Sequence, residues 1–208
     1  MDLTFDDETE EFRAEVRDFL AANTEHFPPV VSYDLAEGFE QHRHWDKVLF
    51  DAGLSVIVWP KEYGGRDATL LQWIVYEEEY FRAGAPGRAS ANGTSMLGGP
   101  TLFAHGTSEQ RNRILPKMAS GEEIWAQAWS EPESGSDLAS LRSTATQTDG
   151  GWKLNGQKIW SSRAPFGDKA FGLFRSDPSA QRHKGLTYVM FDLRAEGVTV
   201  RPIAQLGG

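Results

Sequence analysis

The chain has 208 residues, 39% of them hydrophobic and 25% charged, and its formal net charge is −9 at pH 7. This length is sufficient for one large or two small domains, and the negative charge argues against duplex DNA or an anionic membrane surface as the main partner. The lack of cysteine excludes disulfides, thiolate catalysis and cysteine-ligated metals, and the five histidines do not cluster as ligands do. We therefore expect no metal site.

Apolar runs and the first residues bear on where the protein is found. No run approaches the ~20 apolar residues of a membrane span. The acidic segment at residues 1–7 differs from the basic start of a secretory or transit peptide. These features predict a cytoplasmic protein without a membrane span.

The first part of the chain shows the apolar periodicity of amphipathic α-helices. A capping box at residues 4–7 predicts the start of the first helix, and Asn23 with the prolines at 28 and 29 predicts its end. Thr107 and Gln110 predict the cap of a later short helix, which Pro116 distorts or ends. Helices are expected at residues 4–23, 38–52, 68–83, 90–104 and from 107 onward. They predict an N-terminal α-helical domain at residues 1–121.

Two polar groups within these helices are interpreted as solvated. Glu77, Glu78 and Glu79 form an exposed face, because neighbouring helix residues do not face each other as paired carboxylates must. His42 and His44 are interpreted in the same way. Neither group is expected to carry chemistry.

From residue 124 the apolar period changes to two, which indicates β-strands. Turn sequences separate the expected strands, at residues 124–130, 140–147, 151–161, 169–175, 185–193 and 197–203. Consecutive short strands without helices between them predict an antiparallel barrel or sandwich at residues 122–208. The predicted fold class is therefore α+β, with a helical bundle followed by a β-domain.

Two polar segments of the β-domain are candidate binding elements. The first, residues 126–137 (AQAWSEPESGSD), leaves a strand and enters a turn in which Pro132 fixes φ and Gly135 permits close approach. The second, residues 155–162 (NGQKIWSS), follows an Asn-Gly hairpin signal and ends in an indole and two hydroxyls. Each segment alone is also compatible with a plain turn and hairpin of an antiparallel sheet.

Together, in this order and at this separation, the two segments resemble the flavin-binding middle domain of the acyl-CoA dehydrogenases. Flanking sequences agree, namely WPKEYGG at residues 59–65, GPTL with HGT at residues 99–107, and RPI at residues 201–203. In that family a second helical bundle follows the β-domain. It carries the general-base glutamate, most of the tetramer interface and the contacts to the adenine end of FAD. We expect residues 1–208 to lack this bundle, and the catalytic base with it.

The resemblance implies that FAD binds along the first segment. Ser130 would donate to the pyrimidine edge of the flavin, Trp160 would form a wall against the ring, and Ser162 would reach N5. The family usually has threonine at both serine positions; serine keeps the donor but loses a methyl group. The residues implied to bind the cofactor are Gln127, Ala128, Trp129, Ser130, Gly135, Ser136, Trp160, Ser161 and Ser162.

Substrate contacts are expected at Ser136 and at a basic cluster. Arg182-His183-Lys184 precedes a strand and is the candidate for the CoA phosphates, with a solvated loop as the alternative. Ser136, His183 and Lys184 are therefore the expected substrate-binding residues. Glu131 is interpreted as a carboxylate that organises the turn and not as the base, and Glu133 is expected to point to solvent.

The reaction implied by the resemblance is α,β-dehydrogenation of an acyl-CoA thioester, as in β-oxidation, with hydride transfer to flavin N5. An electron-transfer flavoprotein would accept the electrons, and the protein would form a homo- or hetero-oligomer. Two alternatives stay open: a flavin monooxygenase or oxidase on the same scaffold, and a non-catalytic subunit of a hetero-oligomer. Residues 1–208 alone are expected to be inactive.

Overall fold

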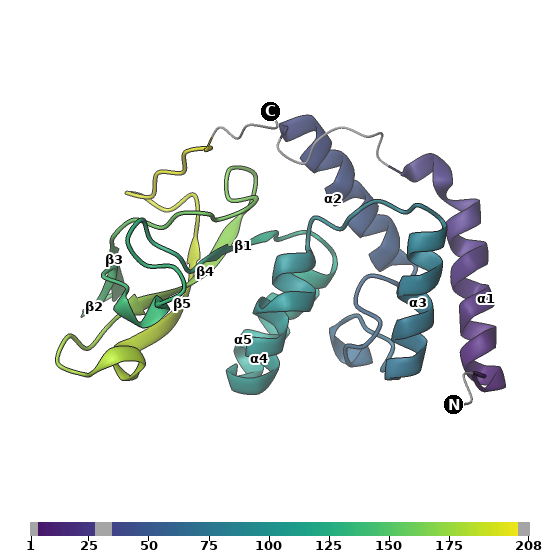
Figure 1. Ribbon diagram of the computed structural model, residues 1–208, viewed down its shortest axis with the longest axis horizontal. Helices are drawn as coiled ribbons and strands as arrows, with labels where there is room; N and C mark the ends of the chain where they lie inside the picture. The colour runs from purple at the N-terminus through teal and green to yellow at the C-terminus, as the bar shows by residue number, and fades with distance from the viewer. Residues whose placement is uncertain (1–3, 28–34, 204–208) are drawn as a thin grey trace. The chain divides into compact units, whose positions relative to one another are not determined.

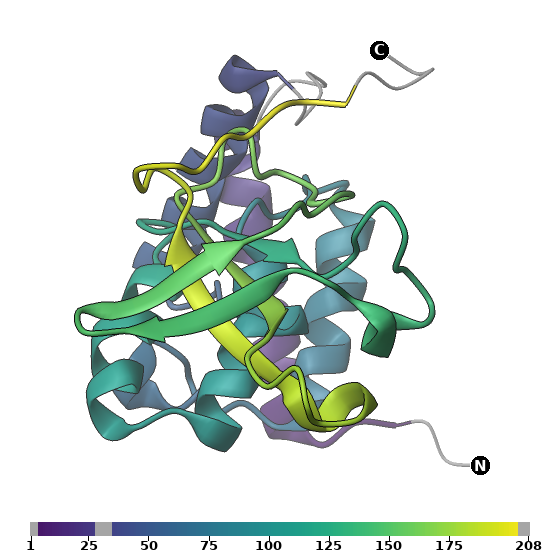
Figure 2. The same cartoon turned by 90° about the vertical axis from the view of Figure 1, so that its left-hand side faces the viewer.

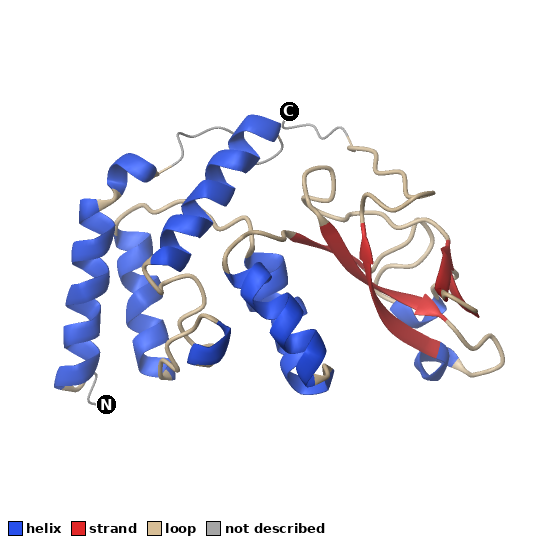
Figure 3. Cartoon of the chain, turned by 180° about the vertical axis from the view of Figure 1, so that it is seen from behind, coloured by secondary structure: helices blue, strands red, loops and turns tan. Residues whose placement is uncertain are grey.

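The computed structural model describes residues 4–27 and 35–203, which Figure 1 shows as a coloured ribbon. The chain divides into two compact units, a helical unit at residues 1–122 and a sheet unit at residues 123–208. The sequence pattern places the division after Gly121, one residue earlier. Figure 3 shows that the long helices belong to the first unit and the strands to the second. The predicted order of a helical domain followed by a sheet domain is confirmed.

Within residues 4–27 and 35–122, the structure describes five α-helices. They are α1 (Asp7–Ala22), α2 (Ala36–Asp51), α3 (Leu70–Arg82), α4 (Gly98–His105) and α5 (Ser108–Ala119). Short helical turns lie between them at η1 (Thr24–His26), η2 (Lys61–Tyr63) and η3 (Asn92–Met96), the last of π type. Among the residues that the structure describes, no helix is long and apolar enough to cross a membrane.

Local capping explains where several helices begin. Thr107 and Gln110 form the predicted capping box of α5, because each side chain bonds the backbone N–H of the other residue, at 3.2 and 2.9 Å. The box expected at residues 4–7 is wrong: Asp6 caps α1, and its carboxylate accepts from Thr9 N at 2.8 Å. Pro116 lies inside α5 and does not end it. A proline removes the hydrogen bond from its own backbone nitrogen to the carbonyl four residues earlier. Pro116 lies in the last turn of α5, so the helix loses this one bond close to its end.

The end of α1 agrees with its sequence prediction, whereas the burial of one of two histidines does not. Asn23 is the C-cap of α1, as predicted, and its side-chain amide donates to Phe19 O at 2.8 Å. The prolines at 28 and 29 lie outside the described residues. His44 is exposed as expected, but His42 is buried, with Nδ1 2.7 Å from Gly87 O. A histidine can enter a core when the chain supplies such a polar partner.

The core of the helical unit joins α1, α2 and α3. Its buried side chains are Phe12, Val16, Leu20, Trp45, Leu49, Leu54, Ile57, Val75, Tyr76 and Tyr80. The polar atoms among them are paired: Trp45 Nε1 donates to the Tyr80 hydroxyl at 2.6 Å, and that hydroxyl donates to Pro86 O at 2.6 Å. Such pairing removes the cost of burying a polar group without a partner.

Glu79 contradicts the interpretation of residues 77–79 as one solvated face. Its side chain is only 2% exposed, because α1 packs along α3 over this position. Arg17 donates to its two oxygens at 2.9 and 3.0 Å, Arg13 donates at 3.2 Å, and Arg82 forms a further ion pair. The hydrogen bonds from Arg17, opposed by burial and aided by Arg13 and Arg82, lower the pKa of Glu79 to about 2. Glu78 stays half exposed.

A mixed five-stranded sheet forms the second unit (Figure 2). Its strands are β1 (Trp125–Ala128), β2 (Thr144–Thr148), β3 (Gly151–Asn155), β4 (Lys169–Arg175) and β5 (Leu186–Asp192). The expectation of purely antiparallel pairing is wrong. β2–β3 and β4–β5 are antiparallel, whereas β4 pairs in parallel with β1 and, at one residue pair, with β2. Apolar alternation reports which face is buried and carries no information on strand direction.

Two predicted strands also need correction. The strand expected at residues 151–161 ends at Asn155, because Gly156 has φ +151° and Trp160 has φ +60°, both outside the β region. The strand expected at residues 197–203 is not formed, and Gly197 there has φ +85°. The interruption after Asn155 turns the second polar segment into a loop that runs beside the turn after β1.

Candidate functional site

The turn that follows β1 is closed by its own backbone. Glu131 N donates to Ser134 O at 2.8 Å, and Ser134 N donates to Glu131 O at 3.1 Å. The Ser134 hydroxyl then donates to Asp137 O at 3.0 Å. These bonds fix the turn while Gly135, Ser136 and Asp137 stay exposed on its outer side. The hydroxyl of Ser136 is therefore presented to solvent by a constrained backbone.

Glu131 organises this turn from inside, as its position in the sequence suggests. Its buried carboxylate accepts from Arg142 N at 2.7 Å, Ser143 N at 3.0 Å and Lys158 Nζ at 2.8 Å. Burial opposes ionisation, but the N–H of Arg142 and the ammonium of Lys158 outweigh it and hold the pKa of Glu131 at about 2. A general base needs a pKa near the working pH, so this carboxylate is not suited to that role.

Lys158 joins the two candidate segments, and the sequence reasoning assigned it no role. Its ammonium donates to Glu131, to Trp129 O at 3.2 Å and to Leu173 O at 2.7 Å, and it lies over the Phe174 ring. Burial lowers the pKa of Lys158. The sequence offers only a weak signal for this residue, a lysine directly before two large apolar residues.

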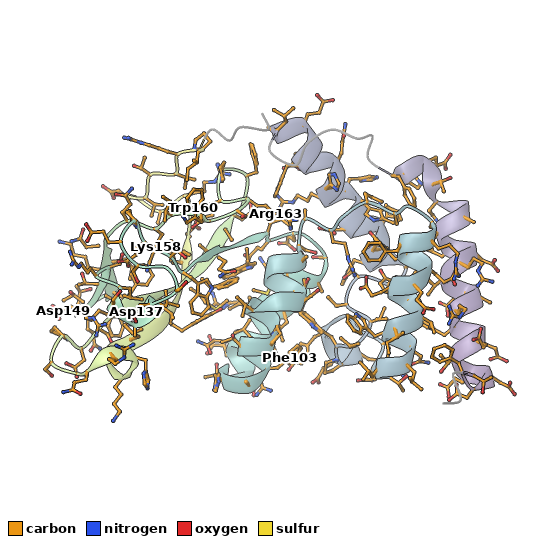
Figure 4. The ribbon with its side chains drawn as sticks, in the orientation of Figure 1. Phe103, Asp137, Asp149, Lys158, Trp160 and Arg163 are labelled. Atoms are coloured by element: carbon orange, nitrogen blue, oxygen red, sulfur yellow. The ribbon has the colours of Figure 1, made fainter. Side chains whose placement is uncertain are left out.

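The second segment presents an indole to solvent. Trp160 is 66% exposed, and its φ of +60° is unusual for a non-glycine residue. Ser162, also exposed, donates its N–H to Trp160 O at 3.0 Å. The buried Ser161 hydroxyl oxygen and Trp129 Nε1 have no hydrogen-bond partner in the structure. Figure 4 labels Trp160 and Lys158 on the sheet unit, with Asp137 on the same unit.

Backbone pairing brings the first segment to the second. Ile159 N donates to Ser130 O at 2.9 Å, so Ser130 lies beside the residue before Trp160. Gln127 is half-buried on β1, opposite Phe171 of β4. The side chain of Ala128 belongs to the buried core of the sheet unit. Of the residues predicted to bind a cofactor, Ser130, Trp160 and Ser162 are therefore brought together with accessible polar or aromatic surface.

The basic cluster lies beside the turn after β1. It lies in the helical turn η5 (Arg182–Gly185), where residues 182–184 are exposed and Gly185 is buried, and the Arg182 guanidinium donates to Asp137 Oδ1 at 3.0 Å. Arg175, which the sequence analysis did not single out, donates to Ala139 O at 2.8 Å and Arg182 O at 3.2 Å. Because Arg182 is paired with Asp137, the exposed side chains of the cluster left to meet an anion are the Lys184 ammonium and the His183 imidazole.

The arrangement fits a flat molecule with polar edges. An exposed indole offers a stacking face, and the neighbouring residues Ser130 and Ser162 carry hydroxyls that can donate. The unpartnered Ser161 hydroxyl is a further buried donor at the same segment. Within the described ranges, no group of three histidine, aspartate or glutamate side chains is placed to hold a metal ion.

Family models match both units of the chain. The model described as acyl-CoA dehydrogenase, N-terminal domain, matches residues 6–122, and the model described as acyl-CoA dehydrogenase, middle domain, matches residues 126–208. This chain belongs to the acyl-CoA dehydrogenase family. The two matches follow the helical unit and the sheet unit, and the second contains both candidate segments of this acyl-CoA dehydrogenase-family chain.

Similar proteins are about twice as long. Acyl-CoA dehydrogenase IpdE1 of Mycobacterium tuberculosis (strain ATCC 25618 / H37Rv) is 41% identical over 206 residues, which cover 97% of this chain and 53% of that protein. The solved structure of the Tcur3481-Tcur3483 steroid ACAD has a TM-score of 0.81 and 33% identity, over 100% of this chain and 53% of that one. The ChsE4-ChsE5 complex from Mycobacterium tuberculosis has a TM-score of 0.80 and 29% identity, covering 100% and 52%. The chain thus spans about half the length of these relatives.

Proposed function

We propose that this chain forms the flavin-facing part of an FAD-dependent enzyme that oxidises acyl-CoA thioesters to their α,β-unsaturated products and passes the electrons to an electron-transfer flavoprotein. One observation carries the proposal: the exposed indole of Trp160 stands beside Ser162, and Ser130 is held next to this segment by the bond from Ile159 N. Family membership supplies the reaction class.

Each flavin-facing residue has a physical role in this proposal. Trp160 offers its ring face to the isoalloxazine, and Ser130 and Ser162 donate hydrogen bonds to its polar edges. Residues 127–136 run along the ring through backbone groups, with Gln127 and Trp129 flanking the buried Ala128. FAD, when bound here, supplies the acceptor for the hydride. The strained φ of Trp160 is consistent with a backbone held for binding and not for stability.

The substrate side of the proposal rests on the outer face of the turn after β1. Ser136 is exposed and would contact the acyl-CoA, while His183 and Lys184 would meet the CoA phosphates. The low pKa of Glu131 leaves proton abstraction to another group. We assign the base to a residue outside positions 1–208, as in the helical bundle of the family.

Replacing Trp160 by alanine tests the flavin site. Removing an aromatic wall that a ligand buries costs about 3–5 kcal/mol, so FAD affinity is expected to fall about 100-fold or more. Because the indole is 66% exposed in the protein alone, the melting temperature is expected to change little. The measurement is FAD titration by flavin fluorescence, with Trp152→Ala as the matched control, since Trp152 is a 48% exposed tryptophan on β3. Equal FAD affinity in both variants contradicts the assignment.

A second candidate function is that of one subunit in a hetero-oligomer that shares the flavin site with a different chain. The similarity to the ChsE4-ChsE5 complex favours it. Size-exclusion chromatography with light scattering, on protein isolated from its natural source, separates the two candidates. A second, non-identical acyl-CoA dehydrogenase chain in the flavin-containing peak supports the hetero-oligomer, and a single chain type contradicts it.

The electron acceptor distinguishes the dehydrogenase from an oxidase or monooxygenase. With an acyl-CoA substrate, we expect product formation when an electron-transfer flavoprotein or an artificial acceptor is present, and little oxygen consumption. The acyl-CoA panel should include straight-chain, branched and steroid-derived thioesters, since one similar structure is a steroid ACAD. Turnover that requires oxygen and ignores the other acceptors contradicts the dehydrogenase.

A further inference from the structure

We propose that Lys158 is a positioning residue of the flavin site, which sets the spacing between the segment that contains Ser130 and the segment that contains Trp160. This inference rests on the proposed function for its link to FAD. Its structural part, the ordering of the two segments by one ammonium group, stands on the geometry of the chain alone.

The three acceptors of Lys158 come from two separate parts of the sheet unit, the segment at residues 129–131 and β4. Its ammonium is 2.8 Å from Glu131 Oε1, 3.2 Å from Trp129 O and 2.7 Å from Leu173 O. An ammonium group has three N–H donors, so these contacts occupy its donor capacity. The side chain of Lys158 thereby ties its own segment to the turn after β1 and to β4.

The flavin-facing residues lie directly beside these tied positions. Ser130 lies between Trp129 and Glu131, both of which accept from Lys158. Trp160 follows Lys158 by two residues, and the intervening Ile159 donates its N–H to Ser130 O at 2.9 Å. A shift of the Lys158 ammonium therefore displaces both sides of the proposed ring site. Binding sites tolerate such displacement poorly, since productive geometry is held within about 0.5 Å.

The contacts exceed what charge compensation of Glu131 requires. One ion pair, together with the N–H groups of Arg142 and Ser143, would already satisfy the carboxylate. The two additional carbonyl acceptors of Lys158 act on geometry and not on charge. With only 11% of its side chain exposed, Lys158 does not reach out to a ligand. Its role is therefore positioning and not direct contact with FAD or substrate.

The first test compares Lys158→Met with Lys153→Met, which removes an exposed lysine from β3 of the same sheet. Amide hydrogen exchange at Ile159 and Arg142 reports, without FAD, how firmly the two segments are held, because Ile159 N bonds to Ser130 O and Arg142 N bonds to the Glu131 carboxylate. We expect exchange at both amides to accelerate about ten-fold or more in Lys158→Met and to stay unchanged in Lys153→Met. FAD affinity is expected to fall about 10- to 100-fold, the loss typical when a supporting partner of a binding site is removed. Unchanged exchange in a folded Lys158→Met protein overturns the proposal.

The double variant Lys158→Met with Glu131→Gln separates positioning from charge compensation and guards against misfolding, because it leaves no unpaired buried carboxylate. We expect it to recover part of the melting temperature, since the glutamine oxygen accepts from only one of the N–H groups of Arg142 and Ser143, but neither the slow exchange at Ile159 nor the FAD affinity. Full recovery of both reduces Lys158 to a charge partner and overturns the proposal. If the unmodified protein binds no FAD, the proposed function fails and so does the link to the flavin, while the exchange data still decide whether Lys158 orders the segments.

Discussion

Replacing Glu79 by glutamine is expected to destabilise the helical unit by about 3 kcal/mol, the lower end of the cost of breaking a buried ion pair. The variant leaves Arg13, Arg17 and Arg82 around a neutral amide, and the guanidinium of Arg13 is itself mostly buried. Chemical denaturation followed by the helical circular dichroism signal measures the loss. Glu78→Gln is the matched control, because Glu78 is 48% exposed and bonded to Arg13 at 2.6 Å. Exposed pairs contribute about 1 kcal/mol or less, so equal losses in both variants contradict the prediction.

The same carboxylate predicts an acid-sensitive stability. The folded pKa of Glu79, about 2, lies below its ordinary value of 4.5, so the folded state favours the ionised form. Its contribution is complete above pH 4.5 and is lost as the pH falls towards 2. The shift corresponds to about 3 kcal/mol. The free energy of unfolding of Glu79→Gln, followed by the helical circular dichroism signal, is expected to lack this contribution to its pH dependence. The Glu78→Gln control is expected to keep it.

Replacing Gly156 by alanine is expected to cost the sheet unit about 2–6 kcal/mol, because strain at positive φ and overpacking each contribute about 1–3 kcal/mol. Gly156 has φ +151°, and a Cβ there would lie 2.7 Å from the backbone Cα of Ser143. The backbone of Ser143 must then move, and its N–H is one of the donors that hold Glu131. The variant should therefore also loosen the turn after β1.

Gly150→Ala is the control for Gly156→Ala, because a Cβ at Gly150, in the turn between β2 and β3, meets no heavy atom within 4 Å. Thermal melts followed by amide hydrogen exchange at the backbone amides of β2 and β4 measure the sheet unit separately from the helical unit. We expect a fall in melting temperature of the sheet unit for Gly156→Ala and almost none for Gly150→Ala. A Gly156→Ala protein as stable as the control would mean that Ser143 can retreat without cost.

Features set by neighbours in the chain could be predicted from the sequence. The capping box of Thr107 and Gln110 involves residues three apart, and the bounds of β4 agree with its apolar pattern at residues 169–175. The burial of Glu79 could not be predicted, because Arg13 and Arg17 approach it from another helix. The parallel pairing of β1 with β4 is likewise invisible to a pattern that records only alternation between two faces.

In the candidate site, too, local features could be predicted from the sequence and contacts between distant residues could not. The two polar segments were found through turn chemistry and resemblance, and the bond from Ile159 N to Ser130 O brings them together. Lys158 was missed because all three of its acceptors are distant in sequence. The strand expected to reach residue 161 was wrong because the φ of Trp160 depends on surrounding contacts that local propensity does not contain.

The central place of β4 has a consequence for the order in which the sheet unit can form. β4 pairs with β1, β2 and β5, and its register with β1 matches Trp125 with Lys169. During synthesis β1 and the β2–β3 hairpin leave the ribosome while their common partner is still missing. The pairing of β1 with β4 closes a loop that contains residues 129–168. Forming such a long-range contact is slow, because the loop loses conformational entropy before the strands pair. The helical unit, whose residues precede Glu123, can therefore become compact first. The sheet can form only after residues 169–175 have been synthesised.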